Sequence, residues 1–194
     1  DGSSAPTSLT VGEPLAVTLP DGAELPVYGS LDDSGRAQFD VAGVLPSARP
    51  VVRMCVPAEN SDAGTLLFTG LAFHGVPSGH EFNSFVLGLY NAPGQPLDDD
   101  LKARAEAIDT PIDVMILVSL TCTMCPETVL AAQRIASLNP NVRAEAYDVA
   151  HFPELKDQYG AMSVPCIVIN HPGGEQKVEF GKKSVPQMLT LLGA

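Results

Sequence analysis

The chain has 194 residues and a formal net charge of −12, and this length suits two domains of about 100 residues each. Proteins that bind nucleic acid neutralise phosphates with lysine and arginine, so the acidic balance argues against DNA or RNA as a partner. No apolar run approaches the roughly 18 residues that suggest a membrane span, and a long one, residues 114–118, has only the length of a strand. We therefore expect a soluble chain that binds neither nucleic acid nor membrane.

The sequence begins with Asp1 rather than methionine, and residues 1–10 are rich in Ser, Gly, Pro and Thr. This composition predicts a flexible lead-in to the first domain. We expect that a segment upstream of Asp1 has been removed, by processing, by cleavage of a signal peptide or by the choice of fragment.

In the first half of the chain, apolar runs alternate with turn residues and predict short strands followed by helices. The predicted elements are a strand at 25–30, a short helix capped by residues 31–34 that runs towards Leu45, a strand at 51–56, two short strands at 65–68 and 71–74 joined at Gly70, a helix that opens at 78–81, and a helical stretch at 101–108 that follows three acids at 98–100.

The helix that opens at residues 78–81 is predicted to be amphipathic. Apolar side chains recur at helical spacing and define its predicted apolar face, which consists of Phe82, Phe85, Val86 and Leu89. Residues 91–96 contain Pro and Gly and are predicted to end the element.

Thr110-Pro111 interrupts the helical pattern, and the elements after it follow the order strand, helix, strand, helix, strand, strand, helix. Their predicted bounds are 112–120, 122–138, 142–149, 153–159, 164–170, 177–180 and, for a last helix capped by Ser184, 184–192.

The two halves of the chain end in the same order of elements. Residues 65–89 and 164–192 each contain two short strands, a glycine-containing turn and an amphipathic helix. This similarity predicts an internal duplication of about 90 residues. We therefore expect two copies of one α/β fold, at residues 11–108 and 109–194.

A pair of cysteines lies where the first strand of the second half gives way to a helix. The segment Cys122-Thr123-Met124-Cys125-Pro126 places both sulfurs within disulfide reach, and the free N–H groups of the helix start favour a thiolate on the first cysteine. Cys122 is therefore predicted as the nucleophile, and Cys125, one turn further on, as the thiol that resolves a mixed disulfide.

Other interpretations of the pair are metal binding and two reduced, buried structural cysteines. Residues 121–125 resemble the Thr-Cys-x-x-Cys loop of heavy-metal chaperone domains, whose two soft thiolates would hold Cu(I). Those domains continue with two strands after the helix, whereas here another helix is predicted after the strand at 142–149. For zinc, Cys166 and His171 would complete a set of four ligands, but they lie about 40 residues from Cys125, beyond the usual spacings. We therefore favour a redox dithiol without a metal.

A proline opens a strand in Ser163-Val164-Pro165. In thioredoxin-like folds a cis proline at this point packs against the dithiol and leaves backbone free to pair with a bound partner, so we expect a cis bond before Pro165. Cys166 is expected to be a small buried side chain, with a third redox thiol as the alternative. Cys55, in the strand at 51–56, is expected in the core.

Several segments together resemble the N-terminal domain of the flavoprotein subunit of bacterial alkyl hydroperoxide reductase. In the second half they are residues 122–126, Ala-Ser-Leu-Asn-Pro at 136–140, Val164-Pro165, and Glu-Phe-Gly at 179–181. In the first half they are residues 31–34, 68–70 and especially Gly-His-Glu-Phe-Asn-Ser at 79–84. The resemblance covers residues 25–192, while the segment 45–64 fits poorly and predicts a shortened or rebuilt edge of the first half.

The resemblance implies two fused thioredoxin-like folds, of which the first is degenerate and only the second carries a dithiol. In that family the domain takes electrons from a dithiol of the flavoprotein and passes them to a peroxiredoxin. No Gly-x-Gly-x-x-Gly follows a strand in this sequence, so FAD and NAD(P)H are expected only in a partner or in domains outside it. The resemblance also implies a cytoplasmic location and a homodimer in the full-length protein.

The strand before the dithiol lacks an acid for proton transfer. In thioredoxin a buried acid lies six residues before the first cysteine, where this chain has Ile116. The resemblance implies that an acid from the first half serves instead, and Glu81 occupies the matching place. Near Cys125 its carboxylate would be a general base with a tuned pKa. The alternatives are a solvated acid at a helix N-terminus and, for His80, either a role in orienting the carboxylate or a place on the surface.

We interpret the chain as a thiol–disulfide oxidoreductase domain. The residues expected to contact a partner are Thr121, Thr123, Met124, Val164 and Pro165. The alternatives are a freestanding disulfide reductase similar to glutaredoxin or protein disulfide oxidoreductase, a module whose first half docks a peroxiredoxin while redox work is secondary, and a metal-binding module.

Overall fold

The computed structural model describes residues 14–18, 24–31, 37–41, 49–57, 66–92 and 97–194. The lead-in predicted at residues 1–10 lies outside them. The described residues fall into two compact units, each with its own sheet. Strands β1 to β3 form the first unit, and the other elements belong to the second.

The first unit is a three-stranded antiparallel sheet in the order β1-β2-β3. Its strands are β1 Pro14–Thr18, β2 Glu24–Leu31 and β3 Ala37–Val41. In the central strand, Tyr28 pairs with Pro14 on one side and with Asp40 on the other. β2 confirms the strand predicted at 25–30.

The short helix predicted to run from residues 31–34 towards Leu45 is wrong. Residues 37–41 form β3 instead, and Phe39 pairs with Gly29 of β2. The sequence Ala-Gln-Phe-Asp-Val alternates apolar and polar residues, which is the period of a strand. Asp and Ser open turns as readily as they cap helices, so the capping signal did not discriminate. The rest of that prediction, residues 32–36 and 42–45, lies outside the described residues.

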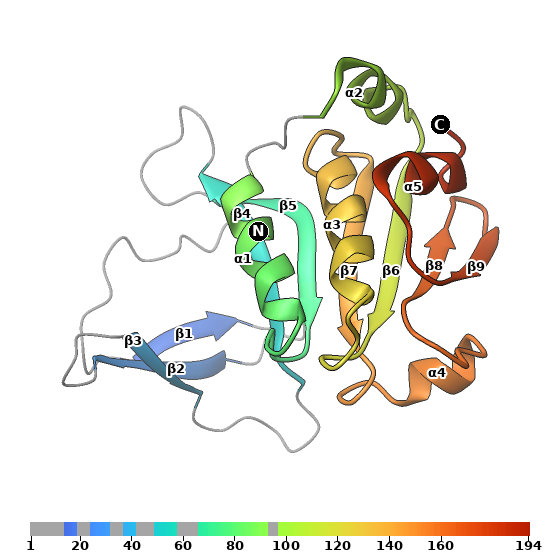
Figure 1. Ribbon diagram of the computed structural model, residues 1–194. Helices are drawn as coiled ribbons and strands as arrows, with labels where there is room; N and C mark the ends of the chain where they lie inside the picture. The colour runs from blue at the N-terminus through green and yellow to red at the C-terminus, as the bar shows by residue number, and fades with distance from the viewer. Residues whose placement is uncertain (1–13, 19–23, 32–36, 42–48, 58–65, 93–96) are drawn as a thin grey trace. The chain divides into compact units, whose positions relative to one another are not determined.

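The second unit is built on a six-stranded sheet in the order β4-β5-β7-β6-β8-β9 (Figure 1). Its strands are β4 Val51–Pro57, β5 Leu66–His74, β6 Ile112–Val118, β7 Val142–Asp148, β8 Cys166–Asn170 and β9 Gln176–Phe180. β5, β7 and β6 run parallel, whereas β8 is antiparallel to β6 and β9 to β8. The parallel strands end at one edge of the sheet, where ligands and catalytic groups gather in open α/β folds.

The helices are α1 Glu81–Asn91, α2 Asp99–Glu106, α3 Cys125–Ala136, α4 Glu154–Gln158 and α5 Val185–Leu191. α3 contacts α1 on one side and α5 on the other, and these three helices cover one face of the sheet (Figure 1). The order β6-α3-β7-α4-β8-β9-α5 confirms the order predicted for the second half. No helix among the described residues is long and apolar enough to cross a membrane.

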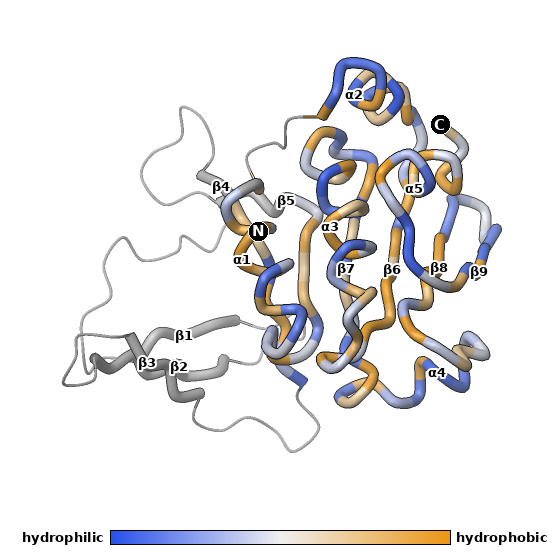
Figure 2. The backbone as a smooth tube through the Cα atoms, in the orientation of Figure 1, coloured by the Kyte–Doolittle hydropathy of each residue, from blue (hydrophilic) through white to orange (hydrophobic). Residues whose placement is uncertain are grey.

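The main hydrophobic core lies between the sheet and the layer of α1, α3 and α5. Apolar residues alternate along β6, so that Ile112, Val114 and Ile116 face α3 while Leu117 joins a smaller cluster on the opposite face (Figure 2). Complete burial of a side chain of this size contributes about 1.5–3 kcal/mol. The core therefore fixes α3, and with it the cysteines, against the central strand.

β5 is one strand rather than the two predicted at 65–68 and 71–74. Gly70, the predicted junction, lies inside β5 with a φ of 80°. A Cβ at this position would come within 3.1 Å of the carbonyl oxygen of Val142 at the start of β7. Glycine thus lets the strand bend against β7 without ending it.

The sheet carries a similar set of elements at each edge. β4, β5 and α1 lie at one edge, and β8, β9 and α5 lie at the other, with α1 and α5 on either side of α3. This arrangement agrees with the order of elements that suggested a duplication. The domain boundary between residues 108 and 109 stays a prediction.

The burial of α1 is the reverse of the predicted one. Phe82, Val86 and Leu89 of the predicted apolar face are exposed, whereas Glu81, Ser84 and Gly88 are buried. Of the predicted set only Phe85 packs against the core. The reason is a close approach at Gly88, where a Cβ would lie 2.8 Å from Met54 Cε and 3.1 Å from Gln133 Oε1. Only a face of small and polar residues lets α1 lie this near to α3.

Two cysteines lie outside the disulfide, and only one of them is buried. Cys166 is buried with Leu117 and Val168 in the smaller cluster, as predicted. Cys55 is exposed, so its predicted place in the core is wrong. β4 is an edge strand, and its neighbouring residue Met54 takes the buried position.

Candidate active site

Cys122 and Cys125 form a disulfide between the end of β6 and the start of α3, with their Cα atoms 5.6 Å apart. This Cα separation lies within the usual range for a disulfide. Cys125 is the first residue of α3 and is fully buried, whereas Cys122 precedes the helix and is partly exposed. A partner can therefore reach the sulfur of Cys122 but not that of Cys125.

The start of α3 is arranged to stabilise negative charge on Cys122. The backbone N–H of Cys125 donates a hydrogen bond to Cys122 Sγ over 3.1 Å. The positive end of the α3 dipole lies at the same place, and both effects favour the thiolate after reduction. This geometry supports the predicted roles of Cys122 as nucleophile and Cys125 as resolving thiol.

The bond between Val164 and Pro165 is cis, as predicted. The carbonyl oxygen of Val164 lies 3.8 Å from Cys122 Sγ. The carbonyl oxygen of Pro165 accepts a hydrogen bond from Gly181 N over 3.0 Å, which fixes this segment to the residue after β9. Of the residues predicted to contact a partner, the structure thus brings Val164 to the reactive sulfur.

The surface around Cys122 contains exposed polar and apolar side chains. Thr121 and Thr123 are exposed, and Met124 is 49% exposed. Met162, two residues before Val164, is 95% exposed and was missed by the sequence analysis. Methionine adapts its shape to different partners, so an exposed Met beside a cis proline is a recognisable signal for a contact surface.

Glu81 lies at the same end of the sheet as the cysteines. The backbone N–H of His80 donates to the carbonyl oxygen of Leu120, two residues before Cys122, over 3.0 Å. α1 follows β5 and α3 follows β6, and since these strands are parallel, the two helices run in the same direction (Figure 1). Gly88 faces Gln133, and two turns earlier on each helix the facing residues are Glu81 and Pro126. The structure therefore brings Glu81 beside the first turn of α3, as predicted.

The Glu81 carboxyl is fully buried, which excludes the alternative of a solvated helix-terminal acid. Ser84 Oγ donates a hydrogen bond to Oε2, and Oε1 has no hydrogen-bond partner among the described residues. Burial raises the pKa of Glu81 from 4.5 to about 7, against the opposing effect of the Ser84 hydrogen bond. Such a carboxyl exchanges protons readily at neutral pH. His80 is exposed, in agreement with its alternative place on the surface.

Gly79 sets the distance between the two helix starts. Its φ is 55°, and a Cβ here would collide with the carbonyl oxygen of Leu120. We predict that Gly79→Ala lowers the free energy of unfolding by about 3 kcal/mol, because left-handed strain and a backbone clash add. Gly160→Ala is the matched control, since Gly160 has a φ of 59° and open space around it. Urea unfolding measures both variants, and equal losses would contradict this role of Gly79.

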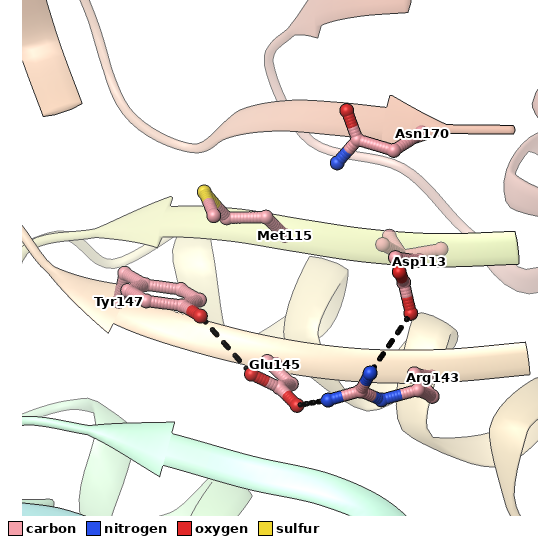
Figure 3. A pocket seen from close by; sticks show the side chains of 7 residues that line it. Asp113, Met115, Arg143, Glu145, Tyr147 and Asn170 are labelled. Atoms are coloured by element: carbon pink, nitrogen blue, oxygen red, sulfur yellow. Dashed lines mark hydrogen bonds and ion pairs between the residues drawn. The ribbon is translucent and has the colours of Figure 1, made fainter. Parts of the chain in front are cut away.

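A second polar cluster lies on β5, β6 and β7. Glu145 accepts hydrogen bonds from Arg143 (2.7 Å) and Tyr147 (3.0 Å), and its Oε2 lies 2.7 Å from His74 Nε2. Burial alone would raise the pKa of Glu145, but the hydrogen bonds from His74 and Arg143 outweigh it and hold the pKa at about 2. Arg143 also reaches Asp113 across a pocket of about 150 Å³ (Figure 3). The sequence analysis missed this cluster, which ties β5 to β7.

Metal ligands do not gather in the part of the chain that the structure describes. Within it, no three His, Cys, Asp or Glu side chains lie close enough together to hold an ion.

A mixed sheet with a disulfide at the start of a helix, and a cis proline beside it, defines a thioredoxin-like thiol–disulfide oxidoreductase. Residues 112–190 match the family of thioredoxin domains. The alkyl hydroperoxide reductase protein AhpF of Pseudomonas aeruginosa is 34% identical over 155 residues, which are 74% of this chain and 30% of that protein. The corresponding protein of Staphylococcus epidermidis is 33% identical over 132 residues, 65% of this chain and 24% of that protein. The chain thus spans less than a third of either relative.

Solved structures give the same result. The N-terminal domain of AhpF from Enterococcus faecalis has a TM-score of 0.59 and 45% identity, over 67% of this chain and 60% of that one. A protein disulfide oxidoreductase from Aeropyrum pernix shares the fold, with a TM-score of 0.55 and 24% identity over 69% of this chain and 60% of that one. The chain is a relative of the N-terminal domain of AhpF, and the predicted resemblance is confirmed.

Proposed function

We propose that the chain passes electrons by thiol–disulfide exchange from the dithiol of a flavoprotein to the disulfide of a peroxiredoxin. The observation that carries the proposal is the asymmetry of the dithiol. Cys122 is partly exposed and receives the N–H of Cys125, while Cys125 is buried behind it. An accessible nucleophile and a protected resolving thiol are what sequential exchange requires.

The reaction takes place in two displacement steps. The Cys122 thiolate attacks one sulfur of the partner disulfide, forms a mixed disulfide and releases the other partner sulfur as a thiolate. Cys125 then loses its proton and attacks Cys122 Sγ, which restores the protein disulfide and releases the second partner thiol. Two electrons pass to the partner, and the reverse sequence, with a donor dithiol, reduces the chain again.

Glu81 is the base for the second step of this proposal. Buried thiols resist ionisation, so Cys125 needs a proton acceptor close by. The ionised Glu81 carboxylate takes the proton of Cys125 as the thiolate attacks, and the neutral carboxyl later returns it to solvent or to a leaving thiolate. A pKa of about 7 gives similar populations of both forms at neutral pH.

The partner contacts the residues around the exposed sulfur. We assign this role to Thr121, Thr123, Met124, Val164 and Pro165, and we add the exposed Met162. The proposal places the electron source, with its FAD and NAD(P)H, in a flavoprotein domain in cis or in trans. It also includes a cytoplasmic setting, a homodimer of the full-length protein, and an origin of residues 11–108 and 109–194 from two copies of one fold.

The proposal is tested with the full chain, reduced chemically and freed of reductant under anaerobic conditions. Mixed with a bacterial peroxiredoxin in its disulfide form, it is expected to lose its two active-site thiols while the peroxiredoxin gains two, counted by alkylation and mass spectrometry. Cys122→Ser is expected to transfer none. Absence of transfer from the wild type, or equal transfer from Cys122→Ser, would reject the relay. Tight binding by a Cys122→Ser variant whose wild type also transfers nothing would favour a docking module.

A further inference from the structure

Ser84 is a buried hydroxyl in α1, one turn after Glu81. Its Oγ lies 2.9 Å from the backbone carbonyl oxygen of Glu81, a contact that buried helical serines commonly make. That contact alone would satisfy the hydroxyl. Ser84 Oγ nevertheless also lies within hydrogen-bond distance of Glu81 Oε2, so the side chain contacts the carboxyl and the backbone of the same residue.

We propose that Ser84 is a positioning residue for Glu81: it holds Oε2 and leaves Oε1 to exchange the proton with Cys125. This inference rests on the proposed function, in which Glu81 is the base. Neither the family comparison nor the sequence pattern assigns a role to this serine.

The two oxygens of the Glu81 carboxyl have different surroundings. Oε2 accepts the hydrogen bond from Ser84, whereas Oε1 is buried and has no partner within the described part of the oxidised chain. A buried carboxylate oxygen without a partner is costly, so its position is expected to serve another state of the molecule. That state is the reduced one, in which Cys125 carries a thiol proton.

The titratable groups around this end of α1 leave the dithiol as the proton partner. His80 on α1 and Glu127 on α3 both have exposed side chains, and Glu127 pairs with Lys182 over 2.9 Å. Cys125 is buried in the same core cluster to which Phe85 of α1 packs. Among the described residues at this interface, the cysteines are the buried groups that ionise.

The serine also controls how much of the base is ionised. A serine hydroxyl donates more strongly to a carboxylate than to a neutral carboxyl, so its hydrogen bond favours the ionised form. Burial has the opposite effect and is the larger one. Removal of the hydroxyl therefore leaves burial unopposed, and less carboxylate is available at neutral pH.

The test separates the two displacement steps with a small aromatic disulfide, dithiobis(nitrobenzoate). Attack by Cys122 releases one coloured thiolate, and resolution by Cys125 releases the second, so stopped-flow absorbance gives both rates. In Ser84→Ala the first rate is expected to be unchanged. The acid limb of the second rate is expected to move up by about one pH unit, which slows resolution about tenfold below the limb, with recovery towards about pH 9 where the thiol ionises unaided.

Ser137→Ala is the matched control. Ser137 Oγ donates to the backbone carbonyl oxygen three residues earlier, that of Arg134, over 3.0 Å, as Ser84 does to Glu81. It therefore loses the same type of helix contact at a distance from the dithiol, and both its rates and its pH limb are expected to match the wild type.

Two outcomes would overturn the inference about Ser84. They are a second rate in Ser84→Ala with the wild-type limb, and a rate lowered equally at every pH, which would indicate a merely structural serine. NMR titration of the carbon-labelled Glu81 carboxyl in the reduced chain provides an independent readout, in which Ser84→Ala must raise the pKa. Failure of the proposed function is read elsewhere, from Glu81→Gln: if that variant resolves at the wild-type rate, Glu81 is not the base even where Ser84 tunes its pKa.

Discussion

Replacement of Cys125 by serine is expected to trap a covalent complex between Cys122 and the partner protein. The first displacement needs only the Cys122 thiolate and the N–H groups at the start of α3, which the substitution retains. Serine cannot displace a sulfur under these conditions, so the mixed disulfide accumulates instead of passing on. Non-reducing electrophoresis with an oxidised peroxiredoxin is expected to show nearly complete conversion to the complex, against almost none for the wild type.

The exposed Cys55 provides the necessary control for this trap. The complex is expected to persist in the double variant Cys55→Ser, Cys125→Ser and to disappear in Cys122→Ser, Cys125→Ser. Peptide mapping would place the linkage at Cys122. A complex linked through Cys55, or one that forms without Cys122, would contradict the assignment of the nucleophile.

Glu81→Gln is expected to stabilise the oxidised protein at alkaline pH. The pKa of Glu81 is about 7 in the folded chain and near 4.5 when solvated, so ionisation of the buried carboxyl opposes folding as the pH rises. Below about pH 4.5 the carboxyl is neutral in both states and the substitution has little effect. Above about pH 7 the variant avoids a cost of about 3 kcal/mol. Urea unfolding across this range measures the difference.

Glu127→Gln is the control for that stability profile. Glu127 also lies in the first turn of a helix, but its side chain is exposed and pairs with Lys182 at the surface. Its substitution is expected to leave the pH dependence unchanged, since solvent screens such pairs. A Glu81→Gln variant that is destabilised at high pH would show that the carboxylate is held by favourable contacts and is not strained by burial.

The second half of the molecule could be predicted from sequence because its signals are local. Apolar residues run through 112–118, two cysteines start the next helix, and a proline opens a later strand. Each signal lies within one element, and together they specify β6, α3 and the cis bond before Pro165. The strand at Ile116, which lacks the usual acid, pointed to Glu81 only through the family resemblance.

The face of α1 could not be predicted, because periodicity records only where apolar residues recur. Phe82, Val86 and Leu89 recur at helical spacing and are exposed, whereas the buried face contains the carboxyl of Glu81 and the small residue Gly88. A functional carboxyl and a close helix contact decided the orientation against the apolar pattern. The hydrogen bonds of Glu145 were missed for another reason, since they join β5 to β7 over 71 residues of sequence.

The measurement that tests the account most directly is the rate of the second, Cys125-dependent displacement as a function of pH in the reduced full chain. The account predicts an acid limb near pH 7 in the wild type, at the pKa of Glu81, and its loss in Glu81→Gln with slow resolution until the thiol itself ionises. The Cys122-dependent first displacement should be the same in both proteins. An identical limb in the wild type and in Glu81→Gln would contradict the account, because the proton of Cys125 would then leave by another route.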